Sequence, residues 1–204
     1  VMNRLTPVVK NLLILNVGVF ILQNLMPGSI EHALMLFDFR YADFMPFQLF
    51  THMFLHGGIM HLFFNMLWLY FMGPLIEQYI GEKKFIILYV VSGIGAGVLQ
   101  NLSYIFDYPD MVVSTASLGA SGAVAGVMMA AALKFPNMEI VLFPIPIPIK
   151  MKYFVVLYAA YELFQGMSRA NTGIAHFAHL GGMIFGAILI LLWNQTDKNQ
   201  NQWR

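Results

Sequence analysis

Two polar side chains within apolar stretches have the chemistry needed to hydrolyse a peptide bond. Ser121 lies in the segment GASG (119–122), and His179 lies in the segment AHLGG (178–182). A serine hydroxyl is a weak nucleophile until a neighbouring base takes its proton, and a neutral imidazole suits that task. We therefore interpret Ser121 as a candidate nucleophile and His179 as its candidate general base.

The same two segments also favour close helix packing, because small residues let two backbones approach. Either motif taken alone is explained as well by packing as by catalysis, with Ser121 bonded to its own backbone. We expect close helix packing at five glycines: Gly119, Gly122, Gly126, Gly182 and Gly186.

A second polar pair could stabilise the negative charge that develops on the oxygen of a peptide under attack. His61 and Asn65 are four residues apart, so on a helix they share one face. An isolated pair of this kind could simply bond to neighbouring helices. Together with a nucleophile and a base, we interpret His61, Asn65 and the Ser121 amide as oxyanion donors.

The elements that must position these residues are membrane spans. Of the 204 residues, 59% are hydrophobic and 10% are charged, and the mean hydropathy is +0.69. Soluble domains carry about 25% charged residues, and a transmembrane helix needs about 20 mostly apolar ones. We predict an all-α membrane protein with one domain (1–204) and six transmembrane helices in a compact bundle, at residues 8–25, 58–79, 85–105, 116–135, 151–166 and 173–193.

Basic residues predict how these spans are oriented, because Lys and Arg are retained on the cytoplasmic side. With both termini cytoplasmic, nine of the eleven basic residues lie inside, and only Arg40 and Arg169 lie outside. Short loops and the lack of a transit segment favour a bacterial inner membrane. The net charge of +1 gives no indication of nucleic-acid binding, and the absence of cysteine excludes thiolate metal sites.

The predicted topology places the polar residues at one depth. The second, fourth and sixth spans all run from outside to inside, and His61, Asn65, Ser121 and His179 lie about three to seven residues past their external ends. At about 1.5 Å per residue, all four lie roughly 5 to 10 Å below the external surface. These three spans hold no acid at that depth, so we predict a Ser-His dyad and not a triad.

Two connecting segments have distinctive compositions. The long first external loop (26–57) is rich in aromatic residues, and we expect it to be partly membrane-associated or packed on the bundle rim. Residues 143–148 have proline at every second position, which excludes a helix and predicts an extended connector.

Taken together, the motifs resemble those of the rhomboid family of intramembrane proteases. That family has HxxxN in its second helix, GxSG in its fourth and AHxxG in its sixth, and here these read HLFFN (61–65), GASG and AHLGG. The resemblance implies a rhomboid-like fold and an endopeptidase that cuts transmembrane or membrane-proximal segments of other proteins. It implies no cofactor, no ATP and an active site that opens toward the external side.

The resemblance also suggests roles for further residues. His52 and His56 resemble structural histidines in the stretch that leads into the second helix. Substrate would enter between the second and fifth helices, which makes aromatic residues there candidate gate residues: Phe64, Tyr153, Phe154, Tyr158 and Tyr161.

This sequence departs from the family pattern at two places. The family often has Trp-Arg where this chain has Phe47-Gln48, so loop anchoring through that arginine is in doubt. The fourth position after the serine is often an aromatic residue that packs on the catalytic imidazole, and here it is Ala125. Another side chain must therefore orient His179.

Three alternatives compete with a serine protease. His176 and His179 form an HxxH pair, but the HExxH motif of zinc proteases is absent, so we expect no metal. A non-catalytic rhomboid-like relative that binds membrane clients would typically lack the serine or the histidine. A transporter would show inverted repeats. We expect the partners to be transmembrane protein substrates and the lipid bilayer.

Overall fold

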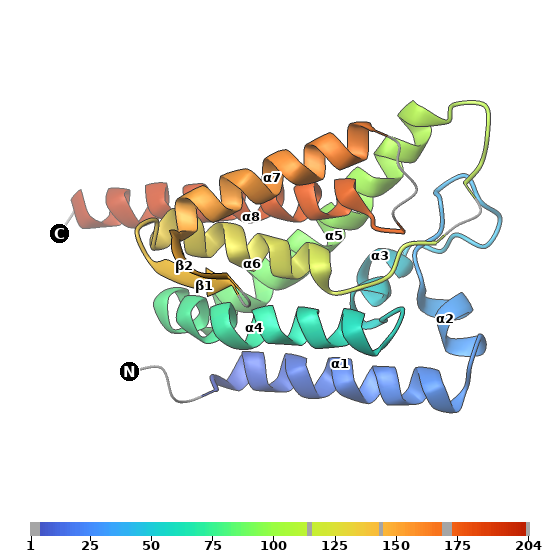
Figure 1. Cartoon of the computed structure of the whole chain (residues 1–204), viewed down its shortest axis with the longest axis horizontal. Coiled ribbons are helices and arrows are strands. Elements are labelled where there is room, and N and C mark those ends of the chain that lie inside the picture. The colour runs from blue at the N-terminus through green and yellow to red at the C-terminus, as the bar shows by residue number, and fades with distance from the viewer. Residues whose placement is uncertain (1–4, 114–115, 143–144, 169–172, 203–204) are drawn as a thin grey trace.

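The computed structural model of this chain is a bundle of helices with one small β-hairpin (Figure 1). It describes residues 5–113, 116–142, 145–168 and 173–202, so Arg169 and the start of the proline-rich segment lie outside the described residues. The elements are α1 (Pro7–Leu25), α2 (Ser29–Leu34), α3 (Gln48–Thr51), the short 3₁₀ helix η1 (His52–Phe54), α4 (Ile59–Ile80), α5 (Glu82–Asp107), α6 (Ser121–Lys134), β1 (Glu139–Leu142), β2 (Ile145–Lys150), α7 (Met151–Met167) and α8 (His176–Gln202).

Each of the six predicted spans overlaps one of the longer helices. Among the described residues, α1, α4, α5 and the segment His176–Thr196 of α8 are long and apolar enough to cross a membrane, whereas α6 has 14 residues and α7 has 17. Large apolar side chains are exposed on the outer helices, as expected for a surface that faces lipid. The chain is therefore an apolar helical bundle, and the number of membrane crossings stays a prediction.

The helix in the fourth predicted span (116–135) begins later than the start of that span. Ser117 instead forms a backbone bridge with Leu36 of the first loop, and Gly119 has a φ of +132°, which a helix does not allow. Helix α6 therefore begins at Ser121 itself.

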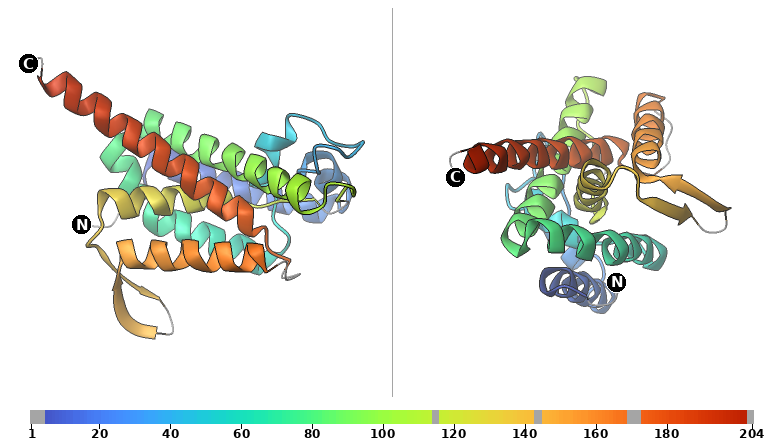
Figure 2. Two further views of the ribbon diagram at one scale, coloured as in Figure 1. Left: turned by 90° about the horizontal axis from the view of Figure 1, so that it is seen from above. Right: turned by 90° about the vertical axis from the view of Figure 1, so that its left-hand side faces the viewer.

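Helix α6 lies near the middle of the bundle, with α5, α8, α7 and α4 around it (Figure 2, right). Its close neighbour is α8, and glycines line the crossing of the two helices. A β-carbon at Gly186 of α8 would lie 2.7 Å from the carbonyl oxygen of Gly126, and one at Gly182 would overlap the carbonyl of Gly122. The α6 and α8 backbones therefore approach closely at these glycines.

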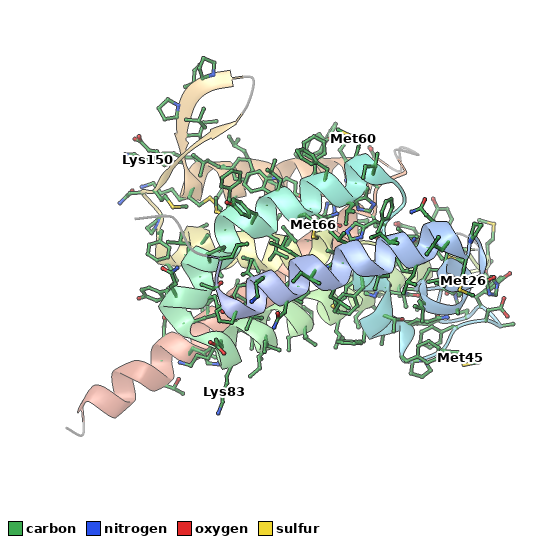
Figure 3. All side chains as sticks on the ribbon, turned by 90° about the horizontal axis from the view of Figure 1, so that it is seen from below. Met26, Met45, Met60, Met66, Lys83 and Lys150 are labelled. Atoms are coloured by element: carbon green, nitrogen blue, oxygen red, sulfur yellow. The ribbon has the colours of Figure 1, made fainter. Side chains whose placement is uncertain are left out.

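The two ends of the bundle differ in what they carry. Both termini and the hairpin lie at one end, and the first loop with α2 and α3 lies at the other (Figure 1). Lys83 and Lys150 lie toward the end with the termini, while Met26 and Met45 lie toward the opposite end (Figure 3). Lys83 and Lys150 thus share one end of the bundle with the two termini (Figure 3).

The first loop is held on the bundle by a buried acid and an arginine. Asp38 is fully buried, and Arg40 bonds to its carboxylate at 2.7 and 3.0 Å and to the carbonyl oxygen of Tyr108 at 2.8 Å. The hydrogen bond from Arg40 is the main reason that the pKa of Asp38 is lowered. Gln48 instead bonds within its own turn, to Met45 and Asp43, so the loop is anchored without an arginine at that position.

The described part of the proline-rich segment, residues 145–148, is extended and forms part of a strand. Strand β2 pairs antiparallel with β1 in a hairpin, with Val141 opposite Pro148, and the hairpin projects from the bundle (Figure 2, left). Prolines are tolerated on such a strand where the N–H would point away from the partner.

A buried carboxylate fixes the start of α1. Glu77 of α4 accepts hydrogen bonds from the backbone N–H groups of Val8 and Val9, at 3.0 and 2.9 Å, and from the Thr6 hydroxyl at 2.5 Å. The first N–H groups of a helix have no intrahelical partner and carry partial positive charge. Glu77 therefore caps α1 and ties it to α4.

We expect Glu77→Ala to lower the stability of the bundle by at least about 2 kcal/mol, because three buried donors lose their shared acceptor. Thermal unfolding of purified protein in detergent would measure this. The matched control is Glu139→Ala, which removes an exposed acid from β1 and should leave the melting temperature nearly unchanged. Equal melting temperatures for the two variants would contradict the capping role.

Gly186→Leu should destabilise the protein by about 1–3 kcal/mol or more, because its side chain would overlap the α6 backbone. Gly18→Leu is the control, since a β-carbon at Gly18 of α1 would meet nothing within 4 Å. Both variants add the same apolar side chain, so a difference in their melting temperatures reports the α6 and α8 contact.

Candidate active site

The candidate nucleophile and the candidate base are in direct contact. Ser121 is the first residue of α6, His179 lies in the first turn of α8, and the Ser121 Oγ is 2.8 Å from the His179 Nε2. Both side chains are partly buried, and the His179 side chain is 12% exposed. The hydroxyl can therefore donate its proton directly to the imidazole.

The turn before Ser121 is held by the first loop. The Gly119 N–H donates to the carbonyl oxygen of His52 at 2.9 Å, and the His52 Nδ1 lies 2.8 Å from the carbonyl oxygen of Gln48. Burial lowers the pKa of His52 to about 4, so its ring is neutral at physiological pH. His52 therefore supports the backbone of this turn, as the resemblance implies.

Gly119 has a different task from the four packing glycines. It lies in the loop before α6, and a β-carbon there would lie 2.8 Å from the His61 Nε2 and 3.7 Å from the Ser121 Oγ. Any larger residue would push these two side chains apart. The absence of a side chain at Gly119 leaves open the space that His61 and Ser121 share.

His61 borders Gly119 from α4, and Asn65 lies one turn further along the same helix. The Gly57 N–H donates to the His61 Nδ1 at 3.3 Å, which leaves the N–H on Nε2, the atom that borders Gly119. Asn65 is buried, and its Nδ2 donates one hydrogen bond to the carbonyl oxygen of His61 at 2.9 Å. Its amide has a second N–H.

Helix α6 itself adds donors at the same place. Ser121 is the first residue of this helix, and the first N–H groups of a helix have no intrahelical acceptor. The macrodipole of the helix makes this end partly positive. The Ser121 amide is therefore suited to a negatively charged oxygen next to its own hydroxyl.

The prediction that no acid would reach His179 is wrong. The carboxylate of Glu162 lies with Oε1 2.9 Å from the His179 Nδ1 and with Oε2 2.5 Å from the His176 Nδ1. Glu162 lies on α7, and its side chain is only 3% exposed. Glu162 lies in the predicted fifth span, which runs in the opposite direction to the second, fourth and sixth spans that carry the other site residues.

A signal for Glu162 is nevertheless present in the sequence. It lies about four residues before the external end of the predicted fifth span (151–166), which at about 1.5 Å per residue puts it roughly 6 Å deep. That is the depth predicted for Ser121 and His179. Counting from the external end of every span would have found it.

Tyr158, one turn before Glu162 on α7, also contacts His179. Its hydroxyl lies 3.1 Å from the His179 Nδ1, and the two ring centroids are 6.0 Å apart with planes tilted by 35°. Ala125 is buried in α6, and Tyr158 supplies the aromatic neighbour that the sequence did not identify. Of the other candidate gate residues, Phe64 and Tyr161 are about half exposed, at 53% and 52%.

The HxxH pair is explained by the same carboxylate. His176 and His179 both direct Nδ1 at Glu162, each to a different oxygen. The Tyr161 ring packs edge-on to the His176 ring, with centroids 6.2 Å apart. The site thus joins residues from α4, α6, α7 and α8.

Comparisons with known proteins agree with the motifs. The family model described as the Rhomboid domain matches residues 43–195, which include every residue of the site. The rhomboid protease AarA of Providencia stuartii is 28% identical over 154 residues, 69% of this chain and 53% of that protein. The rhomboid protease GlpG of Pectobacterium atrosepticum is 24% identical over 192 residues, 94% of this chain and 64% of that protein.

A further relative is the rhomboid protease GlpG of Klebsiella pneumoniae (strain 342). It is 31% identical over 91 residues, which are 44% of this chain and 33% of that protein. This chain therefore spans between a third and two thirds of the length of these relatives. Since the family model covers more than half of the chain, the chain belongs to the rhomboid family.

Proposed function

We propose that this chain is an intramembrane serine endopeptidase in which Ser121 is the nucleophile and His179 is the general base. The observation that carries the proposal is the 2.8 Å contact between the Ser121 Oγ and the His179 Nε2. Membership of the rhomboid family supports it, because the relatives compared above are named as proteases.

The proposed reaction has two halves. The Ser121 Oγ attacks the carbonyl carbon of the scissile peptide while the His179 Nε2 takes its proton. His179 then donates this proton to the leaving amine, which leaves an acyl group on Ser121. In the second half, His179 activates a water molecule that releases the acyl group and restores the serine.

The oxyanion formed in each half would be held by donors from two helices. The Ser121 amide lies at the positive end of α6, and His61 and Asn65 project from α4. Donors that are already in place when the charge forms need no reorganisation, which is why they lower the barrier.

Substrates would be transmembrane or membrane-proximal segments that enter from the bilayer between α4 and α7. The rings of Trp68 and Phe154 stack across these helices, with centroids 5.3 Å apart. Phe64 and Tyr161 expose large apolar rings, and Tyr158 extends the path to His179. We assign these three as gate residues.

The proposed setting is a single domain over residues 1–204 with six membrane crossings. Both termini would be cytoplasmic, in a bacterial inner membrane, and the site would open toward the external side. The position of Lys83 and Lys150 at the end with the termini supports this orientation (Figure 3).

Cleavage of a single-span test substrate by the purified protein in liposomes tests the proposal. We expect Ser121→Ala and His179→Ala to abolish cleavage, because each removes one half of the proton transfer. His32→Ala changes an exposed histidine of the first loop and should cleave like the wild type. Cleavage that survives Ser121→Ala would reject the serine mechanism, and a wild type that does not cleave would favour a client-binding relative.

The oxyanion assignment predicts a separate kinetic signature. His61→Ala and Asn65→Ala should each lower kcat by about 10²- to 10³-fold with little change in KM, because their bonds strengthen only as negative charge develops. Met60→Ala is the control, since Met60 is an exposed residue on the same helix. A rise in KM at constant kcat would indicate substrate binding instead.

A further inference from the structure

The buried carboxylate of Glu162 has no part in the two-residue mechanism proposed above. It lies against both His179 and His176, and an ionised group in an apolar bundle is costly unless it is paired. Building on that proposed function, we propose that Glu162 is a positioning residue for His179 and completes a Ser-His-Glu triad, with His176 holding the carboxylate in place.

The proton on the His179 ring decides whether the serine can be activated. A neutral imidazole carries one ring proton, and the Nε2 can accept the Ser121 proton only if that ring proton lies on Nδ1. A carboxylate only accepts hydrogen bonds, so Glu162 Oε1 at 2.9 Å requires an N–H on the His179 Nδ1. Glu162 therefore selects the reactive tautomer.

Tyr158 competes for the same nitrogen. If its hydroxyl donated to the His179 Nδ1, at 3.1 Å, the ring proton would move to Nε2 and the base would be blocked. A hydrogen bond to an ionised acceptor is about twice as strong as one between neutral groups, and the Glu162 contact is also shorter. With the ring proton on Nδ1, the Tyr158 hydroxyl can instead accept from that N–H.

His176 explains why Glu162 stays in place. It is the first residue of α8 and lies one turn before His179, so both rings reach α7 from the same helix face. The His176 Nδ1 lies 2.5 Å from the second carboxylate oxygen, and the His176 side chain is buried. Both oxygens of Glu162 are thus bonded, which fixes the side chain in one orientation.

The charge of Glu162 also matters during the reaction. The titratable groups that face His179 among the described residues are His61 from α4, Tyr158 and Glu162 from α7, and His176 from α8 itself. Of these, Glu162 is the acid. When His179 takes the serine proton, this carboxylate balances the new positive charge where little water can screen it.

The test compares wild type and Glu162→Gln as purified full chains in liposomes with a single-span substrate. The amide has nearly the same shape, but it carries no charge and can donate to Nδ1, which favours the blocked tautomer. We expect kcat to fall by about 10²- to 10⁴-fold while KM changes less than about twofold. We also expect the acid limb of the rate profile to move to lower pH, because the imidazolium loses its counter-charge.

A variant that only altered the packing would lose kcat without moving the acid limb of the rate profile. Loss of kcat with an unmoved acid limb, or a kcat equal to that of the wild type, would overturn the role of Glu162. The control is Glu139→Gln, which neutralises an exposed acid in β1 and should change neither parameter. Tyr158→Phe distinguishes the effect of Tyr158 from that of Glu162, the other neighbour of the His179 Nδ1. A loss of kcat as large as that of Glu162→Gln would assign the positioning of His179 to Tyr158.

Glu162→Asp keeps the result decisive if Glu162→Gln does not fold, as judged by its melting temperature. Aspartate retains the charge but is one methylene shorter, so we expect a rate between those of wild type and Glu162→Gln. With Glu162→Gln unfolded, a Glu162→Asp variant with a lower kcat and a nearly unchanged KM supports the role of Glu162, and a kcat equal to that of the wild type overturns it. Loss of cleavage in Ser121→Ala reports on the serine mechanism independently of all these variants.

Discussion

The close approach of α6 and α8 determines where the residues of the candidate active site lie. Gly122 and Gly126 on one helix meet Gly182 and Gly186 on the other, with no room for a β-carbon between them. Without a hydrophobic driving force between helices in lipid, such close van der Waals contact is what holds them together. It also brings the first turn of α8 to the first residue of α6, so that His179 reaches Ser121.

A second constraint acts on the polar groups inside this apolar bundle, because a buried polar group without a partner is costly. Glu77 takes the free N–H groups of α1, and Gln100 of α5 accepts from the Ala178 N–H in the first turn of α8. The same requirement applies to Glu162, whose two oxygens bond to His176 and His179. Polar pairs thus fix the relative positions of helices that lipid alone would leave free to slide.

Much of this architecture is readable from the sequence because its main signals are local. Apolar runs predict the helices, and the GASG and AHLGG segments predict both the glycine contacts and the pair formed by Ser121 and His179. Contacts between distant segments are harder to predict. The start of α6 depends on the bridge between Ser117 and Leu36, and the acid at His179 comes from a span that runs in the opposite direction. Neither follows from the periodicity of one segment.

The hairpin at the end with the termini has a further consequence. Pro146 and Pro148 lie on β2 and have no N–H to donate. One edge of β2 pairs with β1, and prolines on such a strand are tolerated where the missing N–H would lie on the free edge. An exposed strand edge with a full row of donors is a template on which another chain can add a strand. The prolines interrupt that row of donors. The hairpin can therefore project from the bundle without pairing edge to edge with the hairpin of another copy in the same membrane.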